Sequence, residues 1–134
     1  MGTGTLTVSS GQLSLTGTGN VTSAGTTGNV ISIGGDLVWS GTTGTTISIT
    51  GTGNLNLTGN LVQATGAGGK ISLAGGNVYI GGTSDFYCGT SPQIDTTGTV
   101  TFNGNVILNV NTSITASTTT FNDTVVGNTH SLSL

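Results

Sequence analysis

Ile47-Ser48-Ile49 is the clearest copy of a short alternating phrase that decides the fold. The same phrase occurs as Ile31-Ser32-Ile33 and as Ile71-Ser72-Leu73, and a glycine follows each copy within two residues. A related phrase, Thr-Phe-Asn, occurs at 101–103 and returns 19 residues later at 120–122. A short strand that returns at nearly regular intervals is typical of a stacked, solenoid-like β-architecture, in which each repeat packs on the next.

The composition agrees with this interpretation. The chain has 134 residues, of which 25 are glycine, one is proline and only 4% are charged, whereas roughly 25% are charged in typical soluble domains. Hydrophobic residues still make up 33% of the chain, which is more than a disordered segment of low hydrophobicity would contain. Thr, Val and Ile favour strands, while Gly, Asn and Ser favour turns. We therefore expect one all-β domain over residues 1–134.

The connections between the strands favour a coil over hairpins. Alternating segments begin about every 7 to 10 residues, which is the spacing of many short strands, and no segment has a helical stripe. Hairpins favour Asn-Gly or Asp-Gly loops, but only Asn103-Gly104 fits that pattern. Segments such as 25–29 and 50–54 instead resemble corners that repeat from turn to turn. With three strands per coil, the sequence predicts a single-stranded parallel β-helix of roughly six coils, without any significant α-helix.

Within such a coil, alternation assigns each residue to the core or to the surface. The outward positions, among them Ser32, Ser48, Asn56 and Ser72, are expected to form ladders of hydroxyls and amides. The expected core positions are Ile31, Ile33, Ile47, Ile49, Leu55, Leu57, Ile71, Leu73, Val106 and Leu108.

Residues 81–95 depart from this pattern. They contain the only proline, Pro92, and two of the four aspartates. Proline and the loss of alternation predict a loop that leaves the coil. Because binding residues gather on such loops, the candidate contact residues are Asp85, Phe86, Tyr87 and Asp95.

The charge pattern excludes several partners. The net charge is −3, with four Asp, one Lys, no Arg and no Glu. Nucleic acid and anionic membranes both require clustered Lys and Arg, so neither is an expected partner. No apolar run approaches the ~20 residues of a membrane-spanning helix, and membrane insertion is not expected.

The chain offers little material for catalysis or for cofactors. Gly34-Gly35-Asp36 resembles part of a calcium-binding repeat, but no second Asp follows one coil away. The segment 64–71 lacks the first glycine and the hydroxyl residue of a phosphate-binding loop. A nucleophile needs a positioned base, and the chain has one His and no Glu. We therefore expect neither an enzyme nor a bound metal or cofactor.

Both ends of the chain have an alternating strand pattern, namely Thr5-Leu6-Thr7-Val8 and Ser131-Leu132-Ser133-Leu134. An unpaired edge strand can recruit another chain. The two segments are therefore expected to pair between copies, which would give a homo-oligomer or filament. Residues 2–10 contain no signal-peptide pattern, so any signal and export domain is expected to lie outside this chain.

Several segments resemble the repeats of filamentous-haemagglutinin-like exoproteins. These are GNLNLTGN at 53–60, GKISLAGGNV at 69–78 and the whole of 99–134. The resemblance covers most of the chain and is clearest over 29–134, outside the loop at 81–95. It implies a secreted bacterial surface adhesin of the kind exported by two-partner secretion. It also implies a right-handed coil that serves as a shaft, with a host or cell-surface ligand.

Ice binding is the third hypothesis, because ice-binding solenoids align Thr-x-Thr motifs in a flat array. Most copies in this chain are Thr-Gly-Thr, which places them at corners. The pairs are Thr5/Thr7, Thr16/Thr18, Thr43/Thr45, Thr50/Thr52, Thr97/Thr99 and Thr118/Thr120.

Overall fold

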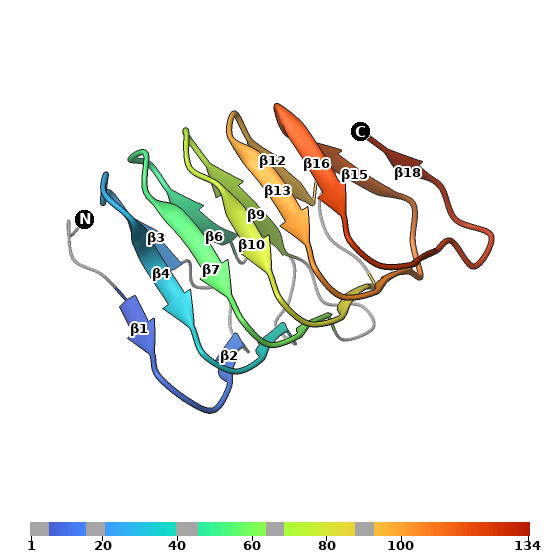
Figure 1. Ribbon diagram of the computed structural model, residues 1–134, viewed down its shortest axis with the longest axis horizontal. Helices are drawn as coiled ribbons and strands as arrows, with labels where there is room; N and C mark the ends of the chain where they lie inside the picture. The colour runs from blue at the N-terminus through green and yellow to red at the C-terminus, as the bar shows by residue number, and fades with distance from the viewer. Residues whose placement is uncertain (1–5, 16–20, 40–45, 64–68, 88–92) are drawn as a thin grey trace.

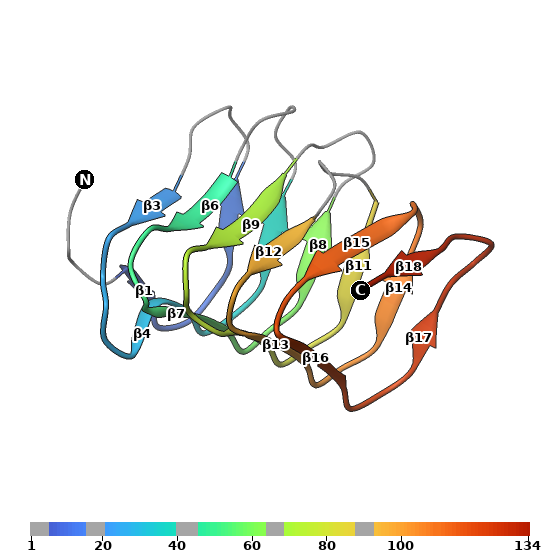
Figure 2. The same ribbon diagram turned by 90° about the horizontal axis from the view of Figure 1, so that it is seen from above.

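The chain winds into a β-solenoid with three sides (Figures 1 and 2). The structure is a computed structural model that describes residues 6–15, 21–39, 46–63, 69–87 and 93–134. These residues form 18 strands in three parallel sheets of six strands each, and none of them is helical. The all-β solenoid predicted from the repeated phrases is therefore confirmed.

Successive strands belong to the first, second and third sheet in turn. The first sheet contains β1 (Leu6–Val8), β4 (Asn29–Ile33), β7 (Asn54–Leu57), β10 (Val78–Ile80), β13 (Thr99–Phe102) and β16 (Thr118–Phe121). The second contains β2 (Leu13–Leu15), β5 (Leu37–Trp39), β8 (Leu61–Gln63), β11 (Ser84–Phe86), β14 (Val106–Leu108) and β17 (Val125–Val126). The third contains β3 (Val21–Ser23), β6 (Thr46–Ile49), β9 (Lys70–Leu73), β12 (Ile94–Thr96), β15 (Thr112–Thr115) and β18 (Leu132–Ser133).

Five turns of the coil lead from β1 to β16, and β17 and β18 begin the next turn. Every interior strand pairs with the strand one coil before it and one coil after it, so its backbone groups are satisfied on both sides. The right-handed winding expected from the resemblance stays a prediction.

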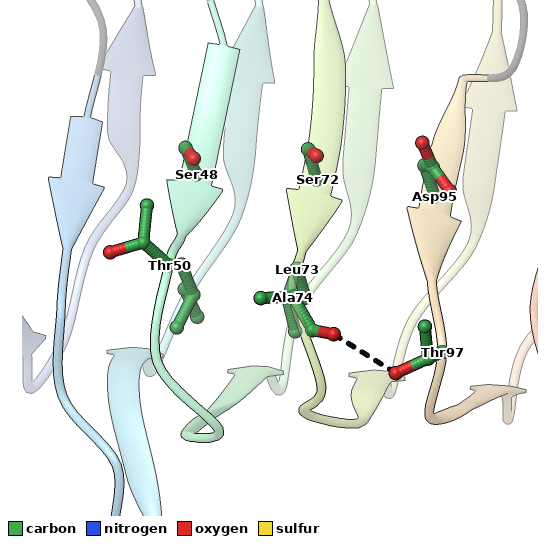
Figure 3. A pocket seen from close by; sticks show the side chains of 8 residues that line it. Ser48, Thr50, Ser72, Leu73, Ala74, Asp95 and Thr97 are labelled. Atoms are coloured by element: carbon green, nitrogen blue, oxygen red, sulfur yellow. Dashed lines mark hydrogen bonds between the residues drawn. The ribbon is translucent and has the colours of Figure 1, made fainter.

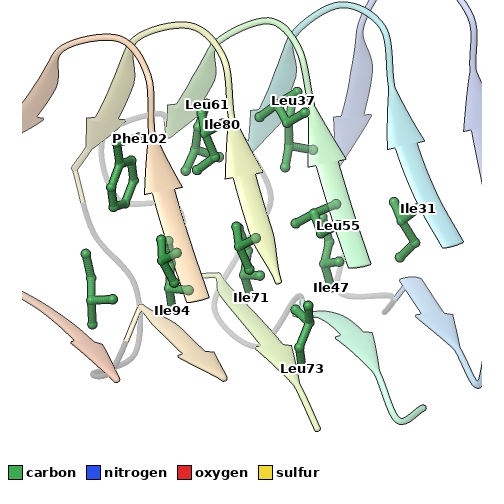
Figure 4. Packing of buried hydrophobic residues seen from close by; sticks show 14 of the residues in the cluster. Ile31, Leu37, Ile47, Leu55, Leu61, Ile71, Leu73, Ile80, Ile94 and Phe102 are labelled. Atoms are coloured by element: carbon green, nitrogen blue, oxygen red, sulfur yellow. The ribbon is translucent and has the colours of Figure 1, made fainter. Parts of the chain in front are cut away.

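The core is a set of columns in which apolar side chains stack from coil to coil (Figure 4). In the first sheet, Ile31 pairs with Leu55, Leu55 with Val78, and Val78 with Val100. All ten residues that alternation assigned to the core are at most 4% exposed. The inward and outward positions therefore follow from the sequence, because a strand places neighbouring side chains on opposite faces.

One strand contains an extra residue that the sequence pattern does not reveal. In β4 the register shifts between Asn29 and Ile31, which leaves Val30 without a partner, as in a β-bulge. Val30 is only 3% exposed. A Cβ on Gly53 would lie 2.4 Å from its side chain, so glycine is needed where the next coil passes over Val30.

The corners are held by asparagine and aspartate side chains that bond to the next coil. Asp36 Oδ1 accepts a hydrogen bond of 2.8 Å from the backbone N–H of Asn60. One coil later, Asn60 Oδ1 accepts one of the same length from the N–H of Thr83. The corner between the third and first sheets has the same arrangement, with Asn77 Oδ1 accepting from the N–H of Thr99 at 2.9 Å. These bonds satisfy donors that the strand ladders leave open.

The prediction of a loop over 81–95 is wrong at both ends of that segment. Ser84–Phe86 is strand β11 and pairs with β8 and β14, and Ile94–Thr96 is strand β12 and pairs with β9 and β15. The reason is that the alternation continues there in a more polar form, with Ser84 and Thr96 taking core positions. Residues 88–92, including Pro92, lie outside the described residues.

Candidate functional site

The chemistry-bearing side chains are dispersed over the solenoid. Asp36 lies at a corner, Asp85 on the second sheet, Asp95 on the third sheet and Asp123 after β16. In the described ranges, no three His, Cys, Asp or Glu residues come together as metal ligands would. The same part of the chain has no helix of the length and apolarity that crossing a membrane requires.

A shallow hollow lies on the outer face of the third sheet (Figure 3). Its volume is about 300 Å³, at the lower end of the range for small-molecule sites. It spans three successive strands, β6, β9 and β12, and the turns that follow them. The residues that line it are Ser48, Ile49, Thr50, Ser72, Leu73, Ala74, Asp95 and Thr97.

The hollow arises from small side chains on its middle strand. Strand register places Ser48 beside Ser72 and Ser72 beside Asp95, so these outward side chains form one row across the three coils. Figure 3 shows this row, with Thr50, Ala74 and Thr97 below it. Ser72 and Ala74 are smaller than most of their neighbours, and the surface is therefore lowest at their coil.

The only lysine of the chain lies at one edge of the hollow. Lys70 Nζ donates to Asp95 Oδ2 at 3.0 Å, and the two side chains are 26% and 40% exposed. A pair this exposed contributes little to stability. Asp95 Oδ1 and the hydroxyls of Ser48 and Ser72 have no hydrogen-bond partner within the described residues. Thr97 is different, since its hydroxyl donates to the carbonyl of Ala74 at 2.9 Å.

The second sheet has a different outer face. Its outward column is mostly apolar and contains Val38, Val62, Ile107 and Val126, with Asp85 in the middle. Partial burial raises the pKa of Asp85 above its ordinary value, while a hydrogen bond of 2.7 Å from Asn109 Nδ2 acts in the opposite direction. The carboxylate of Asp85 is therefore slightly unfavourable on this face.

Replacing Asp85 with asparagine is expected to stabilise the fold at neutral pH by about 0.5 kcal/mol or less, since the site is at the surface. The native state holds the Asp85 proton more tightly than the unfolded state. The contribution of Asp85 to the free energy of unfolding therefore falls as the pH rises. The fall begins near 3.8, the pKa of Asp85 in the unfolded chain, and is complete above its raised pKa in the folded protein. The advantage of Asp85→Asn should vanish below that window. Urea unfolding of both proteins across acid pH measures this, and an advantage that grows towards low pH would contradict it.

The expected contact residues do not form one surface. Phe86 was wrongly assigned to a contact loop, because it occupies a core position of β11 and is 1% exposed. Asp85 and Asp95 lie on different sheets. Tyr87 is 37% exposed and directly follows β11. Sequence reasoning missed Ser48, Ser72 and Lys70 as neighbours of Asp95, although aligning the repeated Ile-Ser phrases with 93–97 would have placed them together.

The two end strands named from the sequence also lie on different sheets. Leu6, Thr7 and Val8 form β1 at the edge of the first sheet, while Leu132 and Ser133 form β18 at the edge of the third. Ser131 and Leu134 flank β18, and Thr5 lies outside the described residues. A junction that continues all three sheets would join β16 to β1, β17 to β2 and β18 to β3. Direct pairing of the two end segments does not fit this topology.

Of the Thr-x-Thr pairs named from the sequence, only Thr118 and Thr120 lie together within one described strand, β16. They pair with Thr99 and Thr101 of β13, which makes a patch of four threonines. In the next coil Tyr79 takes the outward position. Thr5, Thr16, Thr18, Thr43 and Thr45 lie outside the described residues. Ice binding stays a prediction that a thermal hysteresis measurement tests.

We compared the chain with protein-family models, with curated proteins and with solved structures, and none of the three comparisons gives a match. The resemblance to filamentous-haemagglutinin-like repeats stays an expectation from the sequence.

Proposed function

We propose that this chain is a structural rod, a shaft segment of a secreted bacterial surface adhesin of the filamentous-haemagglutinin type. The observation that supports this most is the continuity of the core. The same columns of stacked side chains run through successive coils on all three sheets, so each coil is braced by its neighbours. A rod of this kind separates a ligand-binding tip from the cell and needs no chemistry along its length.

The uncharged surface also supports a rod. The chain has only five charged residues, and they are dispersed. Asp36, Asp85 and Asp123 lie apart from one another, and Lys70 and Asp95 form the one ion pair within the described residues. Corners are instead held by amide and backbone hydrogen bonds, such as those of Asn60 and Asn77. Such bonds depend little on salt, which suits a protein exposed to a variable external medium. On this proposal the chain is not an enzyme.

Two measurements test the shaft. Light scattering of the purified chain should give the mass of one copy, and antibodies raised against it should label intact source cells. Regular filaments of the purified chain would contradict a shaft segment. Labelling that appears only after the cells are made permeable would contradict the surface location.

A second candidate is a filament subunit, and the apolar edges of the outermost coils favour it. Leu6 at one edge is 37% exposed and Val125 at the other is 38% exposed. Val125 continues a core column, since it pairs with the fully buried Val106. A second copy that placed β2 against β17 would cover it. In such a junction, strand addition and apolar burial would act together.

Replacing Val125 with lysine is expected to block such a filament, because the charge would lie in the core column at the junction. Val126 offers a matched control. It is 39% exposed but lies in the outward column beside Ile107, so Val126→Lys should leave assembly unchanged. Light scattering and negative-stain imaging read out both variants. Equal loss of assembly in the two variants, or filaments that tolerate Val125→Lys, would contradict the end-to-end junction.

A further inference from the structure

We propose that the hollow on the third sheet is a weak binding site for a single neutral sugar unit. The proposal goes beyond the rod, and it holds whether the chain is a shaft segment or a filament subunit. It rests on three observations: the shape of the hollow, the unpaired polar atoms that face it, and the arrangement of charge at its edge.

The shape sets the size of the ligand. Adjacent strands in a sheet lie about 4.8 Å apart and alternate residues on one strand about 7 Å apart. The row from Ser48 to Asp95 therefore spans about 10 Å. Thr50, Ala74 and Thr97 lie below this row, in the turns that follow the three strands (Figure 3). An opening of these dimensions, with a volume of about 300 Å³, admits one six-membered sugar ring lying flat. It is too open and too short to enclose a lipid chain.

The polar atoms set the chemistry. The hydroxyls of Ser48 and Ser72 can both donate and accept hydrogen bonds, and neither is used within the described residues. Asp95 Oδ1 is a charged acceptor that can take a hydroxyl donor. These three groups form a row on adjacent strands, so neighbouring hydroxyls of one ring can reach them together. The methyl group of Ala74 lies where the ring's C–H face would rest.

The charge distribution excludes an anionic ligand. Lys70 is the only cation of the chain, and its ammonium group is already bonded to Asp95 at 3.0 Å. A phosphate, sulfate or uronic acid placed in the hollow would meet the carboxylate of Asp95 without a free cation to compensate. A neutral sugar meets no such repulsion, and its hydroxyls leave the ion pair intact.

The affinity is expected to be low. No aromatic side chain lines the hollow, so the stacking that strengthens many sugar sites is absent from it. An open site with three polar contacts corresponds to a Kd on the order of 1 mM. Repetition of such sites along a surface fibre would raise the avidity without any new contact.

Chemical-shift mapping of the isotope-labelled chain tests the site, with neutral methyl glycosides of glucose, galactose, mannose and N-acetylglucosamine as probes. At least one probe should give saturable chemical-shift changes at Ser48, Ser72, Ala74 and Thr97. The amide chemical shifts of the second sheet should not change. Glucuronic acid should bind more weakly than its neutral counterpart. No saturable shift with any neutral probe, or tighter binding of glucuronic acid, would overturn the proposal.

Two variants and a control locate the site. Ser72→Leu should fill the hollow, and Asp95→Asn should remove the charged acceptor while keeping its shape. Each should weaken binding at least about tenfold. Ser32→Leu makes the same substitution at an outward position of the first sheet, and it should leave the affinity unchanged. If Ser72→Leu does not fold, Asp95→Asn decides, and unchanged binding in that variant would overturn the proposal.

Discussion

Replacing Gly76 with alanine is expected to destabilise the solenoid by about 3 kcal/mol or more, because the added methyl group has no space. A Cβ at this position would lie 1.8 Å from the carbonyl oxygen of Gly53, in the coil before. The obstacle is backbone, so no side chain can rotate away. The carbonyl of Gly76 also accepts a hydrogen bond from the buried hydroxyl of Thr96, and a shift of the corner would disturb this bond as well. Urea unfolding measures the loss.

The preceding residue provides the control. A Cβ on Gly75 would lie 3.3 Å from the Cγ2 atom of the exposed Thr52. This side chain can move aside at the cost of one exposed hydrogen bond, from its hydroxyl to the carbonyl of Thr26. Gly75→Ala is therefore expected to change the free energy of unfolding by less than about 1 kcal/mol. Part of any loss is offset because alanine lowers the conformational entropy of the unfolded chain. Equal effects of the two substitutions would show that coils are not in close backbone contact at this corner.

Much of this fold could be predicted because its physics is local and repeated. The phrase Ile47-Ser48-Ile49 states in three residues which side chains enter the core, and its copies at 31–33 and 71–73 imply the stacking. The bulge at Val30 could not be read in the same way, since an extra valine beside an Ile-Ser-Ile phrase looks like one more core residue. Its position depends on how the chain turns from the third sheet into β4.

The expectation at 81–95 failed for the opposite reason. Ser84 and Thr96 are polar residues at core positions. A prediction based on the alternation of apolar residues therefore missed strands β11 and β12. The structure tolerates these residues in the core because the neighbouring coils determine the register. Thr96 bonds to the carbonyl of Gly76 at 2.6 Å, whereas the Ser84 hydroxyl is buried without a partner. A polar core position thus depends on the adjacent coil, which no single stretch of sequence contains.

The candidate site was missed in the sequence for a related reason, because its residues come together only when the repeats are aligned. Ser48, Ser72 and Asp95 are more than 20 residues apart in successive pairs, and each is an ordinary outward residue of its strand. They become neighbours only once the number of residues in each coil is known, and that number varies along the chain. The distance from Ile47 to Ile71 and the distance from Ile71 to Ile94 differ by one residue.

Replacing Phe102 with alanine should be the second severe change, at about 3–5 kcal/mol. Phe102 is fully buried, and its ring stacks on Phe121 at 5.2 Å between centroids and meets Phe86 edge-on at 6.2 Å. Removing it opens a cavity between two rings that belong to coils on either side. Neither ring can close the cavity, because each is held by its own strand pairing.

Phe121→Ala removes the same ring from the last strand of the first sheet, where it is only partly buried and has a coil on one side. Water can fill the space that it leaves, so the loss should be less than half of that for Phe102→Ala. Urea unfolding followed by circular dichroism gives both values. This difference is expected if each coil is stabilised by contacts with its nearest neighbours. An interior ring contributes to the interfaces with two neighbouring coils, whereas a ring in the last coil contributes to one. Comparable losses in the two variants would mean that the outermost coil is as tightly packed as the interior.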